Sequence, residues 1–150
     1  MKIIDQKGFT LIELLVTMAV FAVLAGMAAP AFSSMMKNQD LNKSARELAF
    51  AFTEARAKAA MERRNVQVVL GTLSTDTMAN NNNNQLNWKP VGKSTLKSGS
   101  PVTITFLPTG LTSIGTDSTF EICTEGTGSS SKKIVISRLG NIQPIPGGTC

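Results

Sequence analysis

The chain has 150 residues, with 15 Lys and Arg against 10 Asp and Glu, a net charge of +5, no histidine and two cysteines. This length fits one globular domain. The absence of histidine excludes imidazole catalysis, Ser-His-Asp triads and His-ligated metal sites. We find no paired carboxylates, activated nucleophile or phosphate-binding loop. The composition therefore predicts neither an enzyme nor a bound metal or other cofactor.

A long apolar segment follows a short polar start. Residues 1–8 carry two lysines, whereas residues 14–32 carry no charge. A helix of about 20 apolar residues crosses a bilayer, and basic residues before such a helix favour a cytoplasmic N-terminus. We therefore expect a single membrane span, with the rest of the chain on the other side of the membrane.

The apolar segment as a whole runs from Phe9 to Phe32, and one acid, Glu13, lies inside it. A secretory signal cleaved near Ala29 and a plain membrane anchor are the simpler interpretations. Neither explains a carboxylate whose burial in lipid costs about 2–3 kcal/mol or more. Cleavage between Gly8 and Phe9 would create an amine four residues before Glu13. Pairing with that amine, in the same chain or in a neighbour, would offset the cost of burial.

The helical pattern continues beyond Pro30. Apolar residues recur at spacings of three and four, as on one face of a helix: Leu41, Ala45, Leu48, Phe52, Ala55 and Ala59. Glu54 and Lys58 are spaced for an ion pair. We interpret the basic residues of this half as a solvated face: Arg56, Lys58, Arg63 and Arg64. The pattern predicts one helix from about Phe9 to Glu62, about 80 Å long and kinked or frayed at Pro30.

The remaining sequence indicates a small antiparallel sheet. β-branched or alternating segments occur at residues 66–70, 102–106, 119–123, 133–137 and 141–145. Residues 71–101 give a weak signal and predict a long exposed loop with a short strand around Trp88. The predicted class is α+β, with the amphipathic half of the helix packed on the sheet.

Residues 7–15, KGFTLIELL, resemble the class III leader and cleavage site of type IV pilins and type II secretion pseudopilins. The resemblance implies that a membrane prepilin peptidase cuts after Gly8 and methylates Phe9, and that Glu13 serves in assembly. Pro30 matches the proline that bends the long helix of this family. The implied organisation is a leader (1–8), a transmembrane and assembly segment (9–36) and a globular pilin domain (37–150, with its helix ending near residue 64).

The C-terminal part resembles the GspH/FimT group of minor pilins and pseudopilins, and most of all its FimU and FimT members. The resemblance rests on residues 106–110, a strand ending in Cys123, and residues 134–142. It implies a minor pilin, located in the inner membrane before assembly and in the pilus afterwards, with other minor and major pilins as partners. Such a subunit would help to initiate pilus assembly and support twitching motility and DNA uptake. A type II secretion pseudopilin of the GspH type is the alternative.

Direct DNA binding is a separate hypothesis. Lys132, Lys133 and Arg138 could contact phosphates. FimT-like DNA-uptake pilins carry a C-terminal Gly-Arg-x-Arg, but here Gly140 is followed by Asn-Ile-Gln. The missing arginines argue against a DNA receptor.

Cys123 and Cys150 form an even pair in a domain that we expect to be exported. An oxidising compartment favours a disulfide between them. The bond would contribute about 3–4 kcal/mol by the chain-entropy model and would hold the C-terminus in place.

Overall fold

The computed structural model describes residues 9–71, 82–125 and 130–150. The chain divides into two compact units, Met1–Met36 and Lys37–Cys150. Helix α1, Leu11–Glu62, begins in the first unit and ends in the second, and it stays helical through Pro30. The predicted extent of this helix is confirmed to within two residues at its start. The kink at Pro30 stays a prediction.

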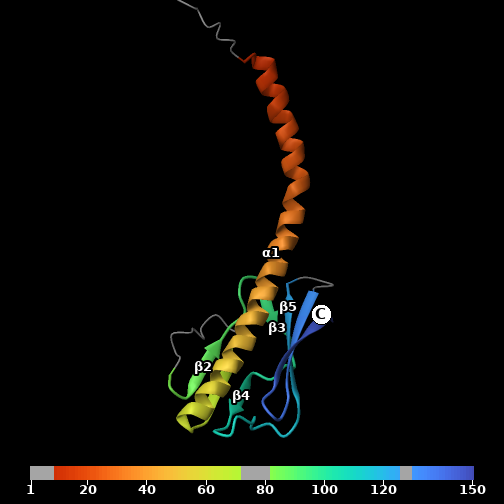
Figure 1. Cartoon of the computed structure of the whole chain (residues 1–150). Helices are drawn as coiled ribbons and strands as arrows, with labels where there is room; N and C mark the ends of the chain where they lie inside the picture. Colours follow the sequence, from red (N-terminus) through yellow and green to blue (C-terminus); the bar gives the residue numbers. More distant parts are fainter. Residues whose placement is uncertain (1–8, 72–81, 126–129) are drawn as a thin grey trace, which may run out of the picture. The chain divides into compact units, whose positions relative to one another are not determined.

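In the described residues of the second unit, seven strands form two sheets. Figure 1 shows strands of both sheets. The first sheet has the order β2-β1-β4 and contains β1 (Val66–Leu70), β2 (Gln85–Trp88) and β4 (Thr103–Phe106). The second has the order β3-β5-β6-β7 and contains β3 (Ser94–Leu96), β5 (Ser118–Thr124), β6 (Ser130–Ile136) and β7 (Ile142–Thr149). The predicted α+β class is confirmed.

The predicted packing of the helix on an antiparallel sheet is confirmed, with two differences of detail. The described residues form two hydrogen-bonded sheets rather than one, and β1 pairs with β2 in parallel, with Leu70 opposite Trp88. A parallel partner requires a long connection, and residues 71–84 supply one. The short strand expected around Trp88 is confirmed as β2, but the surrounding exposed loop is wrong from residue 85 onward, because β3 follows and Trp88 itself is buried. Residues 72–81 of that loop lie outside the described part.

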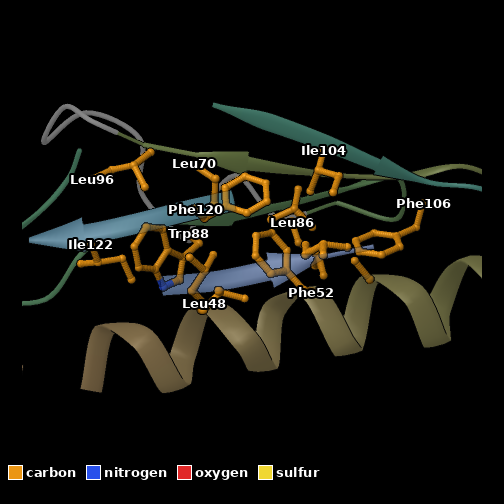
Figure 2. Packing of buried hydrophobic residues seen from close by; sticks show 14 of the residues in the cluster. Leu48, Phe52, Leu70, Leu86, Trp88, Leu96, Ile104, Phe106, Phe120 and Ile122 are labelled. Atoms are coloured by element: carbon orange, nitrogen blue, oxygen red, sulfur yellow. The ribbon is translucent and has the colours of Figure 1, made fainter. Parts of the chain in front are cut away.

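The core of the second unit lies between α1 and the sheets (Figure 2). Five of the six residues of the predicted helix face are buried, and Ala45 packs against them. The Phe52 ring lies 6.4 Å from the Phe106 ring of the first sheet and 4.9 Å from the Phe120 ring of the second. Trp88 of β2 is only 1% exposed. One helix therefore packs against aromatic side chains from both sheets.

Strand β7 forms one edge of the second sheet. It carries Pro144 opposite Ile134 and Pro146 opposite Lys132 of β6. Proline has no backbone N–H and is confined to edge strands or bulges. The two prolines therefore remove two backbone donors from this edge.

A turn at Ser137–Gly140 joins β6 to β7 and approaches a second turn at Gly110. The Gly140 N–H donates to the Ser137 carbonyl at 2.8 Å, and Gly140 has φ +75°. Arg56 of α1 donates from Nε to the Gly110 carbonyl at 3.2 Å and from a terminal nitrogen to the Leu139 carbonyl at 3.5 Å. A Cβ at Gly140 would overlap the Gly110 carbonyl oxygen. Glycine is therefore required here both for its conformation and for space.

We predict that Gly140→Ala lowers the free energy of unfolding by about 3 kcal/mol, the sum of left-handed strain and steric overlap. Gly99 is the matched control, because it has φ +88° but a Cβ at this position would meet no atom within 4 Å. Gly99→Ala should lose about 1 kcal/mol. Denaturant unfolding of the full chain in detergent, followed by the fluorescence of the single buried tryptophan, measures both. Equal losses in the two variants would show that the close approach is unimportant.

Candidate assembly and processing site

The N-terminus of α1 is closed by a reciprocal pair of hydrogen bonds between Thr10 and Glu13. The Glu13 N–H donates to Thr10 Oγ1 at 3.3 Å, and the Thr10 N–H donates to Glu13 Oε2 at 3.3 Å. Thr10 Oγ1 also lies 3.4 Å from the same carboxylate oxygen. This arrangement is a capping box, in which two orphan N–H groups of the first helical turn gain acceptors. The Thr-x-x-Glu spacing is its sequence signal, which the reasoning from sequence missed.

Phe9 lies immediately before this cap and is 89% exposed. The predicted cleavage residue, Gly8, lies outside the described residues. Thr10 is on the C-terminal side of the predicted cut, so both members of the capping box remain in the chain after cleavage. The box can therefore hold the Glu13 carboxylate in the processed subunit as well.

Within the first unit, α1 presents its large apolar side chains outward. They are more than half exposed: Leu11, Ile12, Leu14, Leu15, Val16, Met18, Val20, Phe21, Val23, Leu24, Met27, Phe32, Met35 and Met36. By length and composition α1 contains a stretch able to cross a membrane, with a mean hydropathy of 2.3. An apolar surface of this size is stable only against lipid or other apolar helices.

Comparison with known families accounts for both ends of the chain. A prokaryotic N-terminal methylation motif matches residues 4–29, and the family described as type II transport protein GspH matches residues 44–140. The second match covers more than half of the chain. The chain belongs to the GspH family. The resemblance predicted from the prepilin motif and from the C-terminal strands is confirmed.

Solved structures show the same fold for this GspH-family protein. A crystal structure of the type IV minor pilin FimU from Pseudomonas aeruginosa PAO1 is 22% identical, has a TM-score of 0.53, and covers 75% of this chain and 92% of FimU. A second crystal form of FimU is 24% identical, with a TM-score of 0.51 and coverage of 71% and 93%. No curated protein sequence matches the chain.

The basic residues proposed for DNA contact do not act as three free cations in this GspH-family domain. Lys133 Nζ lies 3.7 Å from Glu121 Oε1 across the β5–β6 pair. Lys132 is its neighbour on the same strand, and successive strand side chains point to opposite faces. Arg138 lies beyond the strand, in the turn to β7, and is exposed. Contact of all three with DNA stays a prediction.

Glu121 is the centre of a charge cluster that the reasoning from sequence missed. Its side chain is 11% exposed and also accepts from Lys97 Nζ at 2.8 Å. The Lys97 hydrogen bond holds the pKa of Glu121 below its usual value of 4.5. Burial opposes this shift, whereas a Ser131 hydrogen bond and the Lys133 charge add to it. The alternation of side chains along β5 predicts on which face of the sheet Glu121 lies. It does not reveal that two cations lie beside it on neighbouring segments.

The predicted disulfide joins Cys123 of β5 to Cys150, with 6.0 Å between their Cα atoms. The bond connects the C-terminal residue to the second sheet and leaves no free cysteine in the chain. The residues that the structure describes include no group of three or more His, Cys, Asp or Glu able to hold a metal ion.

Two interpretations of the helix surface are wrong. Arg56 is not merely solvated, because it bonds the two turn carbonyls described above. Lys43 rather than Lys58 makes the i,i+4 ion pair on this helix, with Glu47 at 3.9 Å. In the described part of the chain Glu54 makes no ion pair. The i,i+4 spacing of a helix allows an ion pair, but it does not determine which rotamers the exposed side chains adopt.

We predict that Glu121→Gln removes a pH-dependent part of the stability. Because the folded pKa is lowered, the charged Glu121 stabilises the fold above pH 4.5, and this contribution is lost as the pH falls through the lower folded value. At pH 7 the variant should be less stable by about 1 kcal/mol, because the two lysines are partly exposed.

The measurement is the wild-type-minus-variant difference in unfolding free energy between pH 7 and pH 3. The difference should shrink as the pH falls. Glu125→Gln is the control, because its ion pair with Lys93 is 3.8 Å long and exposed on both sides. A difference for Glu121→Gln that stays constant with pH contradicts the assignment.

Proposed function

We propose that this protein is a minor pilin of a type IV pilus, a structural subunit that helps to initiate assembly and so supports twitching motility and DNA uptake. The combination that carries the proposal is a methylation motif, a helix with exposed apolar side chains, and a GspH-type domain on one chain. The FimU-like fold supports a pilus subunit. A type II secretion pseudopilin is the alternative, favoured by the name of the matching family.

In this proposal the subunit enters the inner membrane with residues 1–8 in the cytoplasm and residues 37–150 on the opposite side. Prepilin peptidase cuts after Gly8 and methylates Phe9. Residues 9–36 anchor the subunit and then pack among the equivalent helices of other minor and major pilins. Pro30 provides the local bend in this segment. On assembly the exposed apolar side chains of α1 replace their contacts with lipid by contacts with other apolar helices, so they remain out of water.

Glu13 has two successive roles in this proposal. In the single subunit its carboxylate caps α1 through Thr10, which lowers the cost of holding an acid in apolar surroundings. In the assembled bundle the carboxylate pairs with the methylated amine of Phe9 of a neighbour. That exchange replaces a neutral N–H donor by a charged one, and charge-assisted hydrogen bonds are stronger.

We predict that Gly8→Ala blocks processing, because the peptidase is expected to require glycine before the cut. Intact-mass measurement of the membrane-extracted chain should show residues 1–8 still attached and no added methyl group. The wild-type chain should lose residues 1–8 and gain one methyl. A wild-type chain trimmed near Ala29 instead would contradict the proposal, because it would indicate an ordinary signal peptide.

We predict that Glu13→Gln and Glu13→Ala are both processed and both excluded from sheared pili by at least about tenfold. Leaving one member of a buried ion pair unpaired costs about 3–5 kcal/mol. Glutamine can still complete the capping box, so the two variants separate capping from charge. Normal incorporation of Glu13→Gln, with loss only in Glu13→Ala, would show that capping alone matters. Measuring whether the same two variants are incorporated into the pseudopilus of an intact type II secretion system tests the alternative function.

A further inference from the structure

An apolar groove runs between α1 and the edge strand β2 in the second unit. It has a volume of about 450 Å³ and is lined by Arg46, Glu47, Phe50, Ala51, Glu54, Leu86 and Asn87. Leu86 is buried, whereas the Phe50 side chain at the rim is 68% exposed. The exposed Phe50 ring and the apolar groove beside it form one contiguous apolar surface, and such surfaces mark binding sites.

The groove carries opposite charges at its two ends. Arg46 and Glu54 are eight residues apart on α1, which separates them by about 12 Å along the helix axis. Glu47 lies between them and is paired with Lys43. Neither Arg46 nor Glu54 makes an ion pair with any residue that the structure describes. The groove therefore offers an apolar centre with one unpaired cation and one unpaired anion.

The turn at Ser137–Gly140 carries charges that complement those of the groove, and we call it the Leu139 corner. Arg138 and Leu139 are the two central residues of the turn, and Leu139 is 66% exposed. Within the described residues the Arg138 guanidinium makes no hydrogen bond or ion pair. The exposed Asp117 carboxylate lies beside the backbone of the turn, where it accepts from the Arg138 N–H at 3.1 Å. The corner thus carries an apolar knob with a cation and an anion next to it.

The backbone of this corner is held firmly while its side chains face solvent. The Arg138 carbonyl accepts from the Thr112 N–H at 3.2 Å, and the Leu139 carbonyl accepts from Arg56 at 3.5 Å. With the Asp117 contact, every polar backbone group of Arg138 has a partner. A rigid turn loses little conformational entropy on binding. This is the preorganisation expected of a docking element.

The corner and the groove lie on opposite flanks of α1. Arg56 faces the corner, whereas Ala51 and Glu54 face β2 and the groove. At about 100° per residue, Arg56 points about 140° away from Ala51 and about 160° away from Glu54. A subunit therefore cannot insert its own corner into its own groove, so the partner must come from another molecule.

We propose that the Leu139 corner of one copy docks into the α1–β2 groove of a second copy. Leu139 would contact Phe50, with Arg138 directed to Glu54 and Asp117 to Arg46. Because the two surfaces differ, the contact is heterologous. This lateral contact rests on the proposed function, in which the subunit is built into a fibre beside other subunits.

Cysteine cross-linking in the membrane of intact cells tests the contact on the full chain. The two native cysteines are joined to each other, so an introduced cysteine is the only free thiol. Two differently tagged copies, one with Phe50→Cys and one with Leu139→Cys, should be joined by a short bismaleimide. Two copies of Phe50→Cys should not be joined. Val102→Cys, at a residue that is 53% exposed, is the matched control and should not join to Phe50→Cys.

Charge exchange makes the test specific. Glu54→Lys on the Phe50→Cys copy, or Arg138→Glu on the Leu139→Cys copy, should each lower the cross-linked yield by about fivefold. The two changes together should restore it, because the pair is then reversed rather than broken.

Three outcomes would overturn the proposal: cross-linking of Phe50→Cys to itself, cross-linking of Phe50→Cys only to another protein, or no rescue by the charge exchange. If processing and pilus incorporation remain normal in any of these cases, the pilin function stands and only the docking surface is wrong. If cross-linking succeeds while processing at Gly8 fails, the docking surface stands and the proposed function is wrong.

Discussion

The contact of Phe52 with one ring from each sheet is the interaction on which the second unit depends. The two sheets share no hydrogen-bonded strand pair among the described residues, so side-chain packing between them carries much of their association. Phe52 packs against Phe106 of the first and Phe120 of the second. Burial of a large aromatic side chain contributes several kcal/mol. The helix is therefore the element that unites the two sheets, and its register fixes where both lie.

The same register determines which residues are left for function. With Phe52 buried, helical geometry turns Arg56 toward the two turns and leaves Phe50 exposed. In the first unit the large apolar side chains of the described residues stay outward instead. Backbone N–H groups at the start of α1 find acceptors locally, through the reciprocal hydrogen bonds of Thr10 and Glu13. One helix thus serves as an internal core element over one stretch and as an exposed interaction surface over another.

The sequence allowed prediction of the features set by local periodicity. The buried face from Leu41 to Ala59 follows from a spacing of about 3.6 residues, and β4, β5 and β6 follow from a spacing of about 2. The β-branched residues of β1 indicated that strand. The burial of Trp88 and the strand β3 could not be predicted, because they depend on partners distant in sequence. The parallel β1–β2 pair and the cluster around Glu121 were missed for the same reason. In the candidate site, Glu13 was identified by its cost in lipid, whereas its cap partner required the structure.

The two prolines of β7 have a consequence for how copies of this domain can associate. An edge without its full set of backbone donors is a poor template for another strand. Sheets that add to one another edge to edge grow into fibrils that are very difficult to take apart. By removing donors from this edge, Pro144 and Pro146 leave association at β7 to contacts between side chains. Such contacts can be made and broken one at a time, whereas a paired strand edge cannot.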